Sequence, residues 1–246
     1  MTKKKVKEQK GELIFGIHPI IELLKAKRRK LISLYTTKPT PYAFEDIEKL
    51  LPKYHVAIQY VARDVLDRMA GTTDHQNVIA WVHSFPFRKI FFDPKKQPFL
   101  VMLDGVQDPR NLGAILRSAY CTGVDGVIVV KKGGASLTGI AIKSSAGLSE
   151  HLEIYQAQSA AEAVIELKKA GYGIYLATFD GENAATYNYQ LPCCVVIGSE
   201  AVGITKSILS SGVHITLPQK KSDISYNASV AAGILLFLVS TRKNLL

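Results

Sequence analysis

From residue 99 to the C-terminal end, short apolar segments alternate with segments of helical periodicity. The strand-like segments are 99–103, 126–130, 173–178, 195–198 and 213–217, and the helix-like segments are 111–121, 138–148, 160–170, 204–210 and 227–242. The strand-like segments are apolar on both faces, which is typical of a parallel sheet covered by helices on both sides. The alternation therefore predicts an α/β domain over residues 99–246.

The first part of the chain has a smaller α/β pattern of its own. We expect helices at 19–27, 44–51 and 63–69, and strands at 31–35, 56–61 and 78–83. Residues 84–98 break this alternation with three prolines and a polar run, which is typical of a linker, although its four phenylalanines indicate that parts of it pack down. The predicted organisation is a basic disordered tail at 1–10, a domain at 11–84, a linker at 85–98 and a second domain at 99–246.

Positive charge is distributed unevenly along the chain. There are 31 Lys and Arg residues against 21 Asp and Glu, a formal net charge of +10 with a pI of about 9.4. Residues 1–97 contain 19 of the basic and 10 of the acidic residues, so nearly all of the excess precedes residue 98. Such asymmetry is typical of nucleic-acid-binding proteins. A solvated basic surface explains a run of charge equally well.

The cysteine pattern and the N-terminal segment bear on the cellular compartment. The three cysteines are too few for a disulfide framework and lack the spacing of metal ligands. No apolar segment follows the lysines of the N-terminus, as a secretory signal requires, and no apolar run is long enough for a membrane span. We therefore expect a cytoplasmic protein with no metal site and no membrane association.

Most common catalytic signatures are missing. The sequence has no G-x-G-x-x-G after the first strand of the second domain, and no Walker A, H-E-x-x-H or G-x-S-x-G motif. This argues against a dinucleotide-binding Rossmann site and against a P-loop. Three other segments remain, and each combines glycine with polar residues at the end of a predicted strand.

The first segment is 104–117, where a strand leads into a helix. Asp108 or Asn111 is suited to cap that helix. On a helical wheel, Arg117 points about 130° away from the buried stripe, so it should leave the core and face a groove or a partner. An ordinary surface arginine is the simpler interpretation.

The second and third segments, 198–205 and 217–233, also join strands to helices. Gly198 and Gly203 permit tight turns and the close approach of a ligand. Glu200 has three possible uses: as an acid, as a hydrogen-bond acceptor, or as a favourable charge near a helix N-terminus. In the third segment, Ser225, Asn227 or Ser229 is suited to cap the helix that follows.

Taken together and in this order, the three segments resemble the motifs of the SpoU (TrmH-like) branch of the SPOUT RNA methyltransferases. Those motifs read approximately N-x-G-x-x-x-R, G-S-E-G-x-G and I-P-M-x-G-x-x-x-S-L-N-V-S-V-A, and here they fall at 111–117, 198–203 and 217–231. Residues 15–18 and 75–80 resemble the RNA-binding domain of the RlmB-type subgroup, which is similar to ribosomal protein L30e. The resemblance covers roughly residues 13–242.

This resemblance implies a fold, a cofactor and an assembly. The fold is a C-terminal parallel sheet tied in a trefoil knot, a rare exception to unknotted topology, with a small L30e-like RNA-binding domain before it. The cofactor is S-adenosyl-L-methionine, held in the knot by the cofactor contacts Gly198, Gly203, Leu217, Tyr226 and Ser229. The family is dimeric, and its active site forms at the dimer interface. RNA capture is then assigned chiefly to residues 1–97.

The implied reaction is methyl transfer from a sulfonium to a ribose 2′-oxygen of RNA, with no metal. In the family, the motif-one arginine, here Arg117, is proposed to help remove the hydroxyl proton. Arginine is an unusual base because its pKa normally exceeds about 12, so it needs a phosphate or carboxylate nearby. Stabilisation of the developing oxyanion is an equally physical role. The resemblance assigns positioning roles to Asn111, Glu200, Ser225 and Asn227.

The sequence departs from the family pattern at several positions without removing a proposed catalytic side chain. The departures are Asn77, Ala201, Gln219, Lys221, Tyr226 and Ala228. Lys221 and Tyr226 lie in the cofactor segment, so they bear on cofactor affinity.

Three hypotheses for function follow. The first is methylation of a guanosine of large-subunit (23S) ribosomal RNA, the second is the same reaction on transfer RNA, and the third is a non-catalytic RNA-binding or ribosome-assembly protein. We expect structural roles for His18 and His75 and assign no chemistry to the cysteines.

Overall fold

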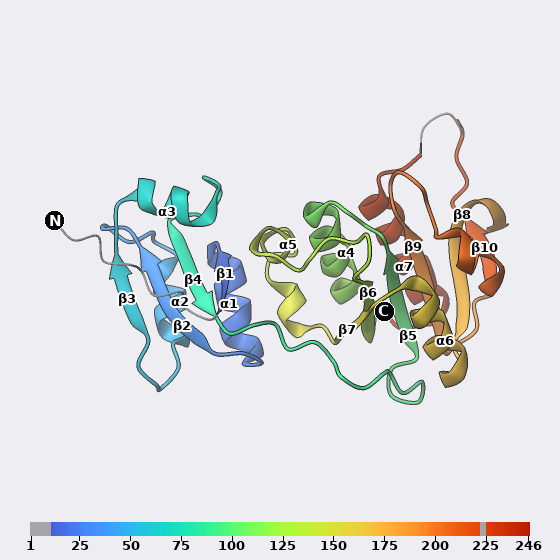
Figure 1. Cartoon of the computed structure of the whole chain (residues 1–246), viewed down its shortest axis with the longest axis horizontal. Coiled ribbons are helices and arrows are strands. Elements are labelled where there is room, and N and C mark those ends of the chain that lie inside the picture. Colours follow the sequence, from blue (N-terminus) through green and yellow to red (C-terminus); the bar gives the residue numbers. More distant parts are fainter. Residues whose placement is uncertain (1–10, 222–224) are drawn as a thin grey trace. The chain divides into compact units, whose positions relative to one another are not determined.

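The computed structural model describes residues 11–221 and 225–246 and divides the chain into two compact units, with the boundary after Pro86 (Figure 1). Each unit is described by itself. The predicted basic tail, residues 1–10, lies outside the described residues.

The first unit is a four-stranded mixed sheet with three helices. Its elements are β1 (Glu12–Phe15), α1 (Ile17–Ala26), β2 (Leu31–Thr36), α2 (Phe44–Leu50), β3 (Ala57–Tyr60), α3 (Arg63–Ala70) and β4 (Val78–Val82). The strand order is β1-β4-β2-β3, in which β4 is antiparallel to both of its neighbours and only β2 and β3 are parallel. Strand β1 was not predicted, because four residues carry too little periodicity to identify a strand.

Part of the basic cluster 25–30 has a structural use. Arg29 is buried, and its guanidinium donates to Oε2 of Glu12 at 2.7 Å and to the carbonyl of His83 at 3.1 Å. The Glu12 carboxylate also accepts a hydrogen bond from the backbone N–H of Phe85 at 3.2 Å. The two ends of the unit are thereby tied together through one ion pair.

The second unit contains a six-stranded sheet in which every pairing is parallel. Its elements are β5 (Phe99–Asp104), α4 (Pro109–Cys121), β6 (Gly126–Val130), α5 (Gly139–Ser144), η1 (Leu148–His151), β7 (Ile154–Ala157), α6 (Ala160–Ala170), β8 (Gly173–Asn183), β9 (Cys193–Gly198), η2 (Lys206–Ser211), β10 (Val213–Thr216) and α7 (Ala228–Arg242). The strand order is β10-β8-β9-β5-β6-β7. The predicted α/β class and parallel sheet are confirmed.

Two predicted helices differ in detail, and one strand was not predicted. The helix expected at 138–148 ends at Ser144, because Ala146 and Gly147 have positive φ angles of 55° and 84° and the chain continues as the 3₁₀ turn η1. The helix expected at 204–210 is likewise a 3₁₀ helix, η2. Strand β7 was missed because it is a four-residue edge strand, half-exposed at its two central positions.

Helices cover both faces of the sheet in the second unit. Helix α6 and η2 pack on one face, over an alternating set of strand residues that includes Leu100, Met102 and Val196. Helix α4 packs against both α5 and α7, and α7 lies against β9. In the described part of the chain, no helix is both long and apolar enough to cross a membrane.

The predicted linker packs onto the second unit from residue 87 onward. The backbone N–H of Arg88 donates to the carbonyl of Ile154 at 2.8 Å, and its guanidinium pairs with Glu153 at 3.0 Å. Phe92 is buried in the core, and its ring occupies the space that a side chain at Gly126 would need. Residues 87–98 are therefore part of the second unit's structure.

This boundary changes where the charge lies. Residues 11–86 contain ten Lys and Arg against eight Asp and Glu, a net charge of +2. Residues 87–246 contain sixteen against twelve, a net charge of +4. The expectation that nearly all of the basic excess falls on the front domain and its tail is therefore corrected, because four of the cations that precede residue 98, at positions 88, 89, 95 and 96, lie in the second unit.

Candidate functional site

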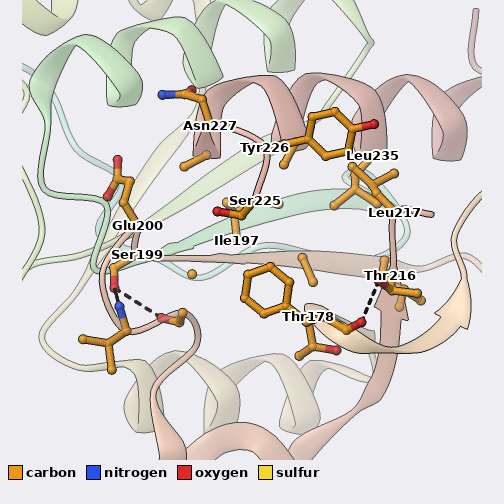
Figure 2. Close-up of a pocket in the computed structure, with 18 of the residues that line it drawn as sticks. Thr178, Ile197, Ser199, Glu200, Thr216, Leu217, Ser225, Tyr226, Asn227 and Leu235 are labelled. Atoms are coloured by element: carbon orange, nitrogen blue, oxygen red, sulfur yellow. Dashed lines mark hydrogen bonds between the residues drawn. The ribbon is translucent and has the colours of Figure 1, made fainter. Parts of the chain in front are cut away.

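The three glycine-containing segments meet at one edge of the parallel sheet. They follow β5, β9 and β10, and the carboxyl ends of parallel strands lie at the same edge, where ligands bind in open α/β sheets. A cavity of about 540 Å³ lies there (Figure 2). Its walls come from the ends of β8, β9 and β10 and from the start of α7: Ala177, Thr178, Phe179, Ile197, Gly198, Ser199, Glu200, Ala201, Val202, Gly203, Ile215, Thr216, Leu217, Gln219, Ser225, Tyr226, Asn227, Ala228, Ala231 and Leu235.

The loop after β9 is closed on itself by hydrogen bonds. The backbone N–H groups of Ser199 and Gly203 each donate to the other residue's carbonyl at 3.0 Å, and Oγ of Ser199 accepts from the N–H of Val202 at 3.2 Å. Gly203 has a φ of +71°, and a side chain at Gly198 would overlap the Gly203 carbonyl carbon. Both glycines are thus required by the backbone, and they present a narrow main-chain wall to the cavity.

A buried carboxylate joins the first two segments. Asp104, the last residue of β5, is buried, and its side chain accepts hydrogen bonds from the backbone N–H of Thr205 at 2.7 Å and from its hydroxyl at 3.0 Å. Asp104 lies opposite Gly198 in the pairing of β5 with β9. This aspartate therefore holds the end of the β9 loop in place.

The first segment contributes a direct contact with the cavity wall. The side-chain Nδ2 of Asn111 donates to Oε1 of Glu200 at 2.6 Å. Asp108 caps α4 by accepting from the N–H of Arg110 at 2.8 Å, which decides between the two predicted caps. Because Asp108 takes the capping role, the amide of Asn111 is available to orient Glu200.

The third segment places three of its predicted residues on the cavity. Ser225, Tyr226 and Asn227 line it beside Leu217, with Glu200 and Asn227 on one side and Leu217 and Leu235 on the other (Figure 2). Oδ1 of Asn227 caps α7, accepting from the N–H and the hydroxyl of Ser229 at 2.8 and 2.6 Å. Ser229 itself is outside the lining, and its hydroxyl is engaged by Asn227.

Sequence reasoning missed a fourth contributing segment, at the end of β8. His214 of β10 pairs with Leu176, but the next residue pairs with Glu182, so residues 177–181 loop out of the sheet. Ala177, Thr178 and Phe179 thereby line the cavity, and the hydroxyl of Thr216 donates to the Phe179 carbonyl at 3.1 Å (Figure 2). The only feature of the sequence that could have pointed to this segment is that residue 178 ends a predicted parallel strand, where ligands bind.

Two known sequence families match this chain in succession. The SpoU rRNA Methylase family matches residues 98–237, and the family described as RNA 2′-O ribose methyltransferase substrate binding matches residues 13–88. The chain belongs to the SpoU rRNA methylase family. The resemblance of its three motifs is therefore confirmed.

Relatives match this chain over nearly its whole length. A protein of Bacillus subtilis named putative TrmH family tRNA/rRNA methyltransferase YacO is 32% identical, over 96% of this chain and 98% of its own length. A protein of Shewanella oneidensis named 23S rRNA (guanosine-2′-O-)-methyltransferase RlmB is 33% identical, over 93% and 96%.

Solved structures share the fold. A crystal structure of an RNA 2′-O ribose methyltransferase superposes with a TM-score of 0.84 at 23% identity, covering 100% of this chain and 93% of the other. The SpoU methyltransferase AviRb from Streptomyces viridochromogenes, in complex with AdoMet, gives 0.82 at 20% identity, covering 99% and 94%. This chain thus shares its fold with both structures over nearly its whole length.

Arg117 of the SpoU motif occupies a different place from the other predicted residues. Leu112, Ile115 and Leu116 are buried as predicted, and Arg117 is exposed on α4. It is not among the residues that line the cavity, and its side chain has no hydrogen bond or ion pair with any residue that the structure describes. Within one chain, therefore, the cavity and the arginine are separate.

The histidine of the 75–80 segment has a structural role. His75 is fully buried, its Nε2 lies 2.7 Å from Oδ1 of Asp67, and its Nδ1 accepts from the backbone N–H of Asn77 at 2.9 Å. A donating Nε2 and an accepting Nδ1 define one neutral tautomer. The ring holds residue 77, whose φ is 59°, in its left-handed conformation.

The buried cysteines and the acidic side chains offer no further chemistry. Burial raises the pKa of Cys193 to about 12 and that of Cys194 well above its usual range, which keeps both thiols protonated and unreactive. Among the described residues, no group of His, Cys, Asp and Glu side chains is arranged to hold a metal ion.

Proposed function

We propose that this chain is an S-adenosyl-L-methionine-dependent ribose 2′-O-methyltransferase that acts on a guanosine of 23S rRNA. The observation that carries the proposal is the glycine-walled cavity, built by the SpoU motifs at the carboxyl edge of the sheet, with Glu200 on its wall held by Asn111. The names of the RlmB relatives support the choice of 23S rRNA as substrate and of guanosine as the target nucleotide. An rRNA substrate implies action in the cytoplasm.

The cavity suits S-adenosyl-L-methionine in size and in lining. Its volume of about 540 Å³ falls within the range of about 300–1,000 Å³ that is usual for small-molecule sites. Gly198 and Gly203 offer main-chain groups at close range, and Leu217 and Tyr226 offer apolar and aromatic surface. Ser229 is assigned a supporting role, since its hydroxyl holds Asn227. When bound, the cofactor supplies a methyl group activated by a sulfonium.

The remaining chemistry falls to the side chains at the mouth of the site. A ribose hydroxyl is a weak nucleophile, so its proton must pass to water as the bond from oxygen to the methyl group forms and the methyl–sulfur bond breaks. Asn111 holds Glu200 through Oε1, and Ser225 and Asn227 also line the cavity and are placed to orient the ribose. The cationic Arg117 stabilises the oxygen as it becomes negative.

For Arg117 to act, a second chain must bring it to the cavity, and we propose a homodimer. Helix α7 is apolar around its whole circumference, and Val230, Ile234 and Phe237 form an exposed stripe with 49%, 37% and 54% of each residue accessible. A helix of this kind is normally buried on all sides. Helix α7 packs against α4, the helix that carries Arg117, and a Cβ atom at Gly233 would lie 3.3 Å from Oγ of Ser118, the residue after Arg117.

The trefoil knot implied by the family is also part of the proposal. It is supported by the strand order β10-β8-β9-β5, and by the convergence of the 198–203 loop and the segment before α7 on one cavity. Tracing the chain in an experimental structure with bound cofactor tests it.

The decisive experiment measures methyl transfer from labelled cofactor to deproteinised 23S rRNA and, separately, to a tRNA pool, with the modified nucleotide mapped by mass spectrometry. We expect a 2′-O-methylguanosine in 23S rRNA. The second candidate, tRNA, rests on the tRNA/rRNA name of the Bacillus subtilis relative, and label in tRNA alone would select it. If calorimetry detects no cofactor binding while the protein still binds RNA, the remaining hypothesis is a non-catalytic RNA-binding protein.

Arg117 is tested in the same assay. Arg117→Ala should lower kcat by about 10²–10³-fold, as expected for loss of a charge that stabilises an oxyanion. Mixing it with a cofactor-site variant such as Gly198→Ala should restore partial activity if one chain completes the site of the other. Equal rates for wild type and Arg117→Ala would remove this residue from the mechanism.

A further inference from the structure

The turn after β6 carries two lysines on a backbone that is fixed at both ends. The N–H of Lys131 donates to the carbonyl of Ala157 at 2.9 Å, and the N–H of Ala135 donates to the carbonyl of Val106 at 2.7 Å. Gly133 has a φ of +78°, and at Gly134 a side chain would overlap the Val130 carbonyl oxygen. Hydrogen bonds thus hold the turn 131–134 at both of its ends.

This turn lies beside the cavity wall. Gly105 separates the two, since a Cβ atom at Gly105 would be 3.6 Å from Cβ of Ser199, a lining residue, and 3.9 Å from the carbonyl oxygen of Gly133. Both neighbours follow parallel strands, so the turn and the cavity share the carboxyl edge of the sheet.

The positive charge on the turn is not neutralised by its surroundings. Lys131 and Lys132 are exposed, and neither ammonium group has an ion-pair partner in residues 11–221 and 225–246. Arg110, in the first turn of α4, is exposed as well. The two carboxylates between the end of β5 and the start of α4 are already engaged, since Asp104 accepts from Thr205 and Asp108 caps α4.

We propose that the Lys131–Lys132 turn binds backbone phosphates of the RNA that flank the nucleotide presented to the cavity. The inference rests on the proposed function, since it takes an RNA ribose to be the methyl acceptor. Every ribose within an RNA strand has a phosphate on each side, so an ammonium pair beside the site meets negative charge whatever the base. Such contacts position the strand and carry no sequence information.

The chain offers a matched control on the opposite edge of the sheet. Lys168 and Lys169 are exposed at the C-terminal end of α6, immediately before β8 begins, and Lys169 pairs with Glu166 at 3.0 Å. Lys168→Ala/Lys169→Ala removes the same two charges as Lys131→Ala/Lys132→Ala. The pair of variants therefore separates location from net charge.

The experiment measures binding of the full-length protein to a 23S rRNA fragment between 50 and 400 mM salt, by fluorescence anisotropy. With Lys131→Ala/Lys132→Ala we expect about ten-fold weaker binding at 0.1 M salt and a salt slope reduced by about 1–2, corresponding to about 0.7–0.9 per phosphate contact. The KM for RNA should rise with kcat little changed. Cofactor affinity by calorimetry should stay as in wild type, and the control double variant should behave as wild type in every assay.

Equal binding and equal slopes for the two double variants would overturn the inference while leaving the proposed function intact. Failure of the proposed function gives a different result, since wild type itself would then transfer no methyl group to any RNA. If the alanine variant does not fold, Lys131→Gln/Lys132→Gln replaces it, and the same comparison decides.

Discussion

The two units differ in strand direction more than in charge. In the first, β4 runs antiparallel to both of its neighbours, so the ends of its strands are divided between two edges. In the second, all six strands are parallel, and every loop that follows a strand reaches one edge. The net charges of the folded parts, +2 and +4, are close to each other. Strand direction is what concentrates chemistry in the second unit.

The comparison also separates two uses of family-like residues. In the first unit, His75 is buried and holds a backbone segment in place. In the second, Glu200, Ser225 and Asn227 line an open cavity. Residues of both units match known family patterns, so a match by itself does not distinguish a structural residue from one at a site.

The largest expected effect tests whether the linker belongs to the second unit. Phe92→Ala should lower the free energy of unfolding of that unit by about 3–5 kcal/mol, because a buried ring leaves a cavity in the core. Ile90→Ala, at a residue that is 79% exposed, is the control and should change it by less than about 0.5 kcal/mol. Chemical denaturation of both variants measures the free energy of unfolding. A loss for Phe92→Ala as small as that for Ile90→Ala would place residues 87–98 outside the unit.

The next effect concerns the first unit. Arg29→Ala should destabilise that unit by about 3 kcal/mol, because it leaves the Glu12 carboxylate without its buried partner. The exposed pair Arg68–Asp64 is the control, and Arg68→Ala should cost about 0.5 kcal/mol or less. Cofactor affinity should be unchanged in both. A loss of cofactor binding with Arg29→Ala would contradict the separation of structural and chemical roles.

A smaller effect sharpens the account of the glycine wall. Gly198→Ala should displace the 198–203 loop, because the new Cβ atom would overlap Gly203, and we expect about 10- to 100-fold weaker cofactor binding, or about 1.4–2.8 kcal/mol. Gly173→Ala is the matched control, since its new Cβ would meet neighbours at ordinary distances of 3.6 Å or more. Calorimetry with S-adenosyl-L-methionine measures both, and equal affinities would remove the steric argument.

The smallest effect depends on pH. Burial raises the pKa of Cys193 from 9.0 to about 12, so the folded state keeps a proton that the unfolded chain loses above pH 9. This contribution to stability is complete below pH 9 and declines as the pH rises toward 12. Between pH 9 and pH 10, the free energy of unfolding of Cys193→Ala should therefore fall by about 1 kcal/mol less than that of wild type. Parallel stability curves for the variant and wild type would count against it.

Local pattern was enough to predict most elements of the second unit. The ranges 126–130 and 160–170 match β6 and α6 to the residue, since both are bounded by glycine or a capping serine. Strands β1 and β7 were missed because a four-residue strand is defined by its neighbour rather than by its own sequence. The helical wheel also predicted that Arg117 leaves the core, which depends only on helix geometry.

The sequence by itself determined the fold class, the family and the three strand ends where a site was to be sought, because periodicity, glycine and caps act within a few residues. Only the tertiary structure decided which of those residues share a cavity. It brought in Ala177–Phe179 through a register shift, chose Asp108 over Asn111 as the cap, and left Arg117 outside the cavity wall. The physical reason is that strand register and the packing of loops across a sheet depend on contacts between residues far apart in the chain, such as Asn111 with Glu200.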